Sequence, residues 1–174
     1  MVLNRVLQFW HALFSKVGPG EISFVKTHLN PEEQSLFFSM DRPTQTHCVR
    51  VARTCLKLLP EYPQVNRRLL MKAALLHDVG KPANLIKTMD KVFIVVMTTL
   101  APRLYDRMLR QKLFYGHFFQ AAAAHANHPQ AGAAIARRVN LSPDVVCLIE
   151  NHHRPQQAGD PPELQILRQA DALH

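Results

Sequence analysis

The chain has 174 residues, of which 47% are hydrophobic and 20% are charged, a composition typical of a folded globular protein and not of a disordered one. Lys and Arg outnumber Asp and Glu by 21 to 13, which gives a formal net charge of +8, so we expect an anionic ligand. The three cysteines form no CxxC pair and no disulfide framework. They indicate a reducing, cytoplasmic setting. Ten histidines remain to be explained.

Residues 1–17 carry apolar side chains at helical spacing, interrupted by Arg5, His11 and Lys16. This pattern predicts an amphipathic helix and not a signal peptide. Two interpretations are open for it: the helix packs on the domain, or it contacts a membrane surface or a partner protein. The longest apolar run, residues 92–101, is about half as long as the roughly 20 residues that a membrane-spanning helix needs. We therefore expect no transmembrane segment.

Helix signals run through the whole chain, and no sustained alternation of apolar and polar residues indicates a strand. Asn30-Pro31 with Glu33 is typical of a capped helix start, and Ser142-Pro143 is a second one. The helices expected in chain order cover about 31–40, 44–59, 65–79 with a stop at Gly80, two segments within 89–113 broken at Pro102, then 117–126, a small-residue segment at 129–139, 142–152 and 162–173.

These elements predict an all-α fold, a single-domain helical bundle. We expect residues 1–43 to form an N-terminal helical extension that packs on a domain spanning residues 44–174. The segments rich in Pro and Gly serve as connections between the helices.

Histidine and aspartate recur at or near the ends of these expected helices. In chain order they are His47, the pair His77-Asp78 with Lys81 after it, His128, the pair His152-His153, and Asp171. Because their neighbours are apolar, the helices that carry them are expected to converge on one pocket. Each residue alone is a weak signal, whereas the ordered series is a strong one.

Imidazole and carboxylate ligands suit divalent Fe, Mn, Zn, Co or Ni. Asp78 is the candidate for a bridge between two ions, because a carboxylate can bind one ion with each oxygen. Two ions about 3.5–4 Å apart can activate a shared water and hold a phosphate group for in-line displacement. Lys81 is placed to neutralise phosphate charge.

The sequence HDVGK at residues 77–81 is similar to the HD-x-G-K signature of the HD domain superfamily of metal-dependent phosphohydrolases. The segments NHPQAGAAIA and ENHHRP resemble the corresponding stretches of its HDIG and HD-GYP branches. The resemblance covers about residues 44–174. It implies the all-α HD fold with a metal site at its centre.

The resemblance also implies roles for individual residues. His47, His77, Asp78 and Asp171 would hold a first ion, and Asp78 would bridge to a second ion held by His128 and His152. His153 would complete that second site, contact phosphate or serve a third ion. Lys81 would contact substrate phosphate, with Asp78 and Lys81 the catalytic pair.

The sequence departs from the HD-GYP pattern after His153, where Arg154-Pro155 and the residues that follow replace the D-G-x-G-Y-P run. This absence disfavours cleavage of cyclic di-GMP. Arg154 is either a bidentate phosphate ligand for the substrate or an ordinary surface residue. The interval between Asp78 and His128 is longer than in HD-GYP proteins and contains the apolar region 91–113.

Two functions follow as hypotheses. The first is a metal-dependent phosphohydrolase or phosphodiesterase that acts on a nucleotide or a related phosphate ester through a metal-activated water. The alternative is a non-catalytic module that binds a metal or a nucleotide and engages a partner. Clusters of basic residues, such as Arg103, Arg107 and Arg110, fit a phosphorylated ligand or plain solvated helix faces. The chain has no motif specific for nucleic acid.

Overall fold

The computed structural model describes residues 18–81, 96–98, 100–110 and 116–174. Within these ranges the chain is helical and contains no strand, so the predicted all-α class is confirmed. The elements are α2 (Pro19–His28), α3 (Pro31–Ser39), α4 (Arg42–Leu58), the 3-10 turn η1 (Leu59–Glu61), α5 (Arg67–Leu76), α7 (Pro102–Arg110), α8 (Gly116–Arg138), α9 (Pro143–Asn151) and α10 (Pro162–Ala172).

Polar side chains fix the starts of several helices. Asn30 and Glu33 form a reciprocal capping box at α3, in which each side chain accepts a 2.8 Å hydrogen bond from the other residue's backbone N–H. The Ser142 hydroxyl accepts from the N–H of Val145 at the start of α9. Such caps satisfy backbone donors that the first turn leaves unpaired. Both helix starts were predicted from the sequence and are confirmed.

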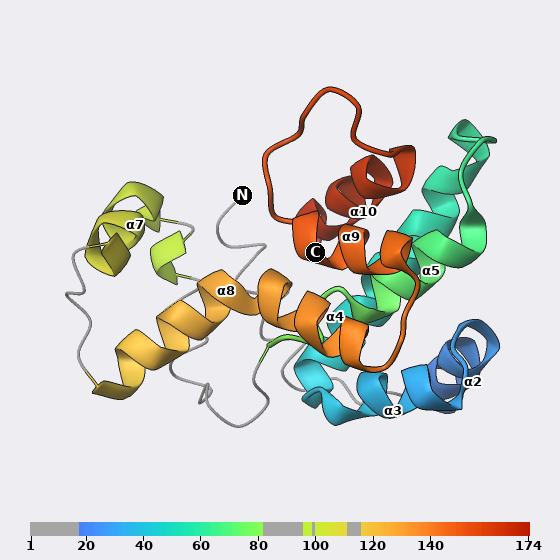
Figure 1. Cartoon of the computed structure of the whole chain (residues 1–174), viewed down its shortest axis with the longest axis horizontal. Helices are drawn as coiled ribbons and strands as arrows, with labels where there is room; N and C mark the ends of the chain where they lie inside the picture. The colour runs from blue at the N-terminus through green and yellow to red at the C-terminus, as the bar shows by residue number, and fades with distance from the viewer. Residues whose placement is uncertain (1–17, 82–95, 99, 111–115) are drawn as a thin grey trace.

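The core lies where α4, α5, α9 and α10 pack against one another. Helix α5 is at its centre: six of its ten residues, from Leu70 to Leu76, are buried. Figure 1 shows α9 and α10 on one side of α4 and α5, and α2 and α3 on the other side. Val25 of α2 and Phe37 of α3 are fully buried in the same core. The arrangement brings the ends of α5 and α9 close to α4 and α10.

Helix α8 is one continuous helix, whereas the sequence suggested separate segments at 117–126 and 129–139. Pro129 lies inside it. A proline removes one backbone donor and bends a helix without always ending it, and in Figure 1 the two halves of α8 run in different directions. Ala133 and Ala136, after the proline, are fully buried in the core next to α9. This packing stabilises the second half in spite of the proline.

Helix α5 ends at Leu76, earlier than expected, and His77 is its C-cap. Gly80 therefore does not stop the helix. It lies against α8: a Cβ atom added there would be 2.1 Å from the carbonyl oxygen of His128 and 2.3 Å from the nitrogen of Gly132. The residue must be glycine because the two backbones touch. This contact places the turn after α5 directly beside His128.

Helix α2 was not expected from the sequence, although Pro19 and Glu21 are suitable residues for a first helical turn. The predicted helix within residues 1–17 lies outside the described residues, as do residues 89–95 and 111–113 of the apolar region. The predicted break at Pro102 coincides with the start of α7. No described helix is both long enough and apolar enough to cross a membrane.

Candidate metal centre

The first group of possible ligands joins three helices. His47 comes from the second turn of α4, His77 caps α5, and Asp171 lies in the last turn of α10. The Oδ1 atom of Asp171 lies 2.9 Å from His47 Nε2 and 3.5 Å from His77 Nε2. These three ligand atoms are close enough to one another to hold one ion. The prediction that these helices converge is confirmed at this point.

The second group comes from α8 and the end of α9. His128, His152 and His153 each offer a ring nitrogen, and these atoms could also hold one ion. The Nε2 atoms of His128 and His152 are 3.2 Å apart. The rings of His128 and His152 are buried, while the His153 side chain is 47% exposed. The group therefore has two buried ligands and one at the surface.

Asp78 lies between the two groups and is almost completely buried. Its Oδ2 atom faces the first group, at 3.6 Å from His47 Nε2 and 3.5 Å from His77 Nε2. Its Oδ1 atom faces the second group, at 3.1 Å from His128 Nε2 and 4.0 Å from His152 Nε2. Each carboxylate oxygen thus faces a different set of imidazoles, as a bridging ligand requires.

Backbone carbonyls orient two of the imidazoles. The Nδ1–H of His77 donates to the carbonyl of Ala74 at 3.0 Å, and that of His152 donates to the carbonyl of Ile149 at 2.6 Å. With Nδ1 donating, Nε2 is the ring atom that can bind a metal once it carries no proton. Among the described residues, His77 Nε2 and Asp78 Oδ1 are buried atoms that make no hydrogen bond. Buried polar atoms without partners are uncommon, so this donor set fits bound divalent cations.

The charged groups of the site shift one another's pKa values. Burial alone would raise the pKa of Asp78, but Lys81 and His77 hold it well below its usual range. Burial likewise disfavours charge on His77, yet the neighbouring Asp78 raises the pKa of His77 well above its ordinary value. Three neighbouring histidines lower the pKa of Asp171 in spite of its burial. Both carboxylates are therefore ionised at neutral pH, as metal ligands must be.

Lys81 occupies the side of Asp78 that faces the first group. Its Nζ atom lies 2.5 Å from Asp78 Oδ2, and the Lys81 side chain is 26% exposed. The ammonium group thus offsets part of the negative charge of the buried carboxylate. A phosphate group that entered the site from this direction would meet a positive charge.

Cys48 is a member of the site that the sequence reasoning missed. Its buried Sγ atom lies 3.9 Å from His77 Nδ1 and, with His77 and Asp78, forms a third group of possible ligands. Burial raises the pKa of this thiol, which keeps it in the neutral form that binds metal poorly. The only feature of the sequence that pointed to Cys48 was its position next to His47. We interpret Cys48 as packing behind His77.

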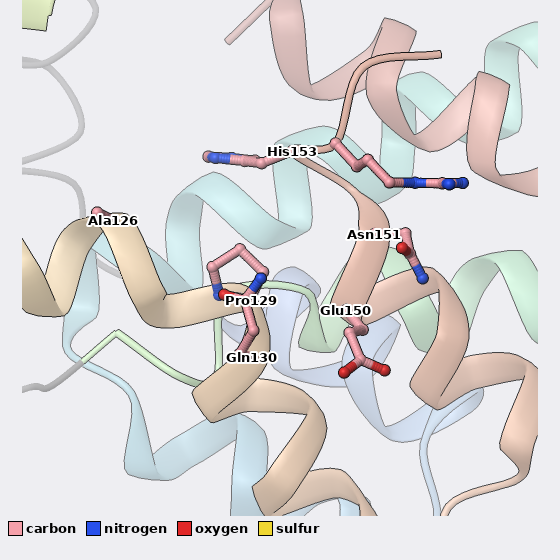
Figure 2. A pocket seen from close by; sticks show the side chains of 7 residues that line it. Ala126, Pro129, Gln130, Glu150, Asn151 and His153 are labelled. Carbon is pink, nitrogen blue, oxygen red and sulfur yellow. The ribbon is translucent and has the colours of Figure 1, made fainter. Parts of the chain in front are cut away.

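Arg154 lies at the rim of a pocket of about 510 Å³ between α8 and the end of α9. Figure 2 shows Gln130 and Glu150 on one side of this pocket and His153 on the other. The guanidinium group of Arg154 donates to Asp160 and to Gln157 within its own loop. The structure brings it to the edge of the site beside His153 but binds it to the loop. Its predicted contact with substrate stays a prediction.

A helical bundle whose centre holds two groups of histidines around one buried aspartate defines a class of metal-binding α-helical domain. The model of the HD domain family matches residues 44–174, three quarters of the chain, and the chain belongs to this family. HD domains are in general metal-dependent phosphohydrolases. None of the curated proteins and none of the solved structures compared with the chain matches it.

Proposed function

We propose that the protein is a metal-dependent phosphohydrolase or phosphodiesterase of the HDIG type that acts on a nucleotide or a related phosphate ester. The observation that carries this proposal is the position of Asp78, whose two oxygens face two different sets of imidazoles. Bound divalent ions, whether Fe, Mn, Ni, Co or Zn, supply Lewis-acid charge and lower the pKa of a water nucleophile.

The proposed ligands divide between two ions. His47, His77, Asp78 and Asp171 would hold the first, and Asp78, His128 and His152 the second, with His153 at its exposed side. Asp171 Oδ2 lies 3.6 Å from His153 Nε2, so Asp171 also touches the second group. The buried Asp78 carboxylate and the carbonyl-oriented imidazoles are held in place before any ligand arrives, which reduces the reorganisation needed on binding.

Lys81 is the residue that we assign to the substrate. Its ammonium group would bind a non-bridging phosphate oxygen and stabilise the negative charge that develops there during displacement. The short contact with Asp78 keeps the ammonium group charged, because the carboxylate raises the pKa of Lys81 in spite of burial. Arg154, at the rim of the neighbouring pocket, is our second candidate for a phosphate contact.

The experiment is a hydrolysis assay on protein purified without added metal and then loaded in turn with Mn²⁺, Fe²⁺, Co²⁺, Ni²⁺ or Zn²⁺. The substrates are nucleoside mono-, di- and triphosphates, cyclic mono- and dinucleotides and a chromogenic phosphodiester. We expect a hydrolysis product with at least one metal, which is inorganic phosphate from a nucleoside phosphate, a ring-opened nucleotide from a cyclic one, or the free chromophore from the phosphodiester. This product should be lost in the Asp78→Ala and His77→Ala variants. Tight metal or nucleotide binding without any product would contradict the proposal and favour a non-catalytic binding module.

A further inference from the structure

Asp160 is a carboxylate outside the candidate metal centre that is paired with two arginines. It precedes Pro161, the N-cap of α10, at the end of the loop that follows His153. Its side chain is only 4% exposed, and both of its oxygens accept hydrogen bonds. Arg154 donates to Oδ1, while Oδ2 accepts from Arg168 at 2.6 Å and from the backbone N–H of Gln157 at 2.8 Å.

Arg168 connects this carboxylate to α9. While one of its amino groups donates to Asp160, the other donates to the backbone carbonyl of Asn151 at 2.9 Å. Asn151 is the last residue of α9 and directly precedes His152. Arg168 lies on α10, one turn before Asp171. A single guanidinium group therefore joins the end of α9 to the helix that carries Asp171.

The segment held in this way carries His152 and His153. The carbonyl of Ile149 orients His152. Helix α9 ends at Asn151, and His152 and His153 lie in the turn that follows. The His153 ring contacts the rings of His128 and His152. The His153 side chain is 47% exposed. Its position therefore depends on how the loop from residue 152 to residue 161 is fixed at its two ends.

This network has the properties of a rigid support. Two arginines share one carboxylate, and charge-assisted hydrogen bonds of this kind are stronger and more directional than neutral ones. Hydrogen bonds from Arg168 and from the Gln157 N–H lower the pKa of Asp160, so the carboxylate keeps its charge at neutral pH. Gly159, with φ of +85°, allows the tight turn that brings Asp160 back to Gln157.

We propose that Asp160 is a positioning residue that acts through Arg168 and Arg154 to hold His152 and His153 in place for the second ion. This inference rests on the metal site of the proposed function. Asp160 touches neither the ion nor the substrate. Its effect is transmitted by the Asn151 carbonyl and by the backbone that follows. Groups that orient metal ligands typically change metal affinity by about 10- to 100-fold when they are removed.

The test is a titration of the metal-free protein with Mn²⁺, monitored by calorimetry. Elemental analysis of the desalted protein then gives the number of ions bound. The parent protein should bind two ions. The His128→Ala variant should lose one of them, and the ion that is lost is the second ion. In Asp160→Asn and Arg168→Gln, we expect the dissociation constant of the second ion to rise at least about 10-fold, with that of the first ion unchanged. Arg168→Lys, which can still pair with Asp160, should restore part of the affinity.

Arg137→Gln provides the matched control. Arg137 of α8 forms an exposed ion pair with Glu150 of α9, so this variant also breaks an arginine–carboxylate pair that involves α9. It should bind both ions like the parent. Unfolding of each metal-free variant, followed by circular dichroism, separates loss of position from loss of the fold.

Three results would overturn the proposal. They are unchanged affinity for the second ion in both network variants, an equal loss of affinity for both ions, and a parent protein that binds fewer than two ions. The outcome does not depend on catalysis. A protein that binds two ions and hydrolyses nothing contradicts the proposed function, while the effect of Asp160→Asn on the second ion is still measured.

Discussion

The Nε2 atoms of His128 and His152 lie 3.2 Å apart inside the protein, beside Oδ1 of Asp78. Burial, together with the neighbouring His77 and His153, lowers the pKa of His152 well below its ordinary value, so this imidazole is neutral and can bind a cation. With metal–nitrogen distances of about 2.0–2.1 Å, two nitrogens on one ion lie roughly 3.0–3.4 Å apart. The two rings are thus already spaced like ligands of one ion.

Replacing Asp78 by Asn should remove this arrangement. The change deletes the negative charge that faces both groups of imidazoles, so we expect the bound metal to fall to less than half of the parent value. Elemental analysis of the purified protein measures this content. Asp144→Asn, at an exposed acid in the first turn of α9, is the control and should keep the parent content. Full metal content in Asp78→Asn would contradict the bridging role.

Lys81→Met should separate metal binding from catalysis. The variant keeps the length of the side chain but loses the charge assigned to the substrate phosphate, so we expect kcat/KM to fall by about 10²-fold while two ions remain bound. Lys26→Met, on the exposed face of α2, should leave both quantities unchanged. An unaltered kcat/KM in Lys81→Met would remove Lys81 from the mechanism.

Gly80→Ala should destabilise the protein severely. The new Cβ would lie 2.1 Å from the carbonyl oxygen of His128 and 2.3 Å from the nitrogen of Gly132, and these backbone atoms cannot rotate away. Overpacking of this kind costs about 3 kcal/mol in the free energy of unfolding, which urea denaturation measures. Gly20→Ala places its Cβ in open space and should cost less than about 0.5 kcal/mol. Equal stability of the two variants would contradict the contact.

The metal-free protein should lose stability in acid through Asp78 and Asp171. Both carboxyl groups have a lower pKa in the folded protein than the ordinary value of 3.8. Their stabilising contribution is therefore complete above about pH 4 and is lost as the pH falls through the folded pKa values. Each group adds a slope of about 1.4 kcal/mol per pH unit in this range.

Denaturation of the metal-free protein at a series of pH values between 2 and 6 measures this slope. The Asp171→Asn variant should show a shallower dependence below pH 4, because one of the two groups no longer titrates. A dependence as steep as that of the parent would show that Asp171 does not contribute.

Much of the fold follows from local sequence signals. Asn30 with Glu33, and Ser142 with Pro143, predicted helix starts that the structure contains, because capping depends on residues within one turn of each other. The continuous α8 did not follow from such signals. Whether a helix continues through Pro129 depends on the packing of Ala133 and Ala136 against the core, which lies far away in the sequence. Gly80 was wrongly predicted to stop α5, because its contact with the backbone of α8 also lies far away in the sequence.

The sequence named the histidines and aspartates that the structure brings together at the candidate site, but it named neither Cys48 nor the residues that support the site. The order of His47, His77, Asp78, His128, His152 and Asp171 matches the HD pattern, so residue types and order were sufficient to name them. Asp160 and Arg168 carry no motif, and their relation to His152 depends on a contact between the end of α9 and α10. Only the packed structure places that guanidinium group at the Asn151 carbonyl.

We propose above all that the protein, with two ions held around Asp78, would hydrolyse a phosphate ester. The most direct measurement combines the number of ions bound per chain with the hydrolysis products formed from a nucleotide panel, for the parent protein and for Asp78→Ala. We predict two ions and release of product for the parent, and at most one ion and no product for the variant. Release of product by the variant at the parent rate, or two bound ions without any product from the parent, would contradict the account.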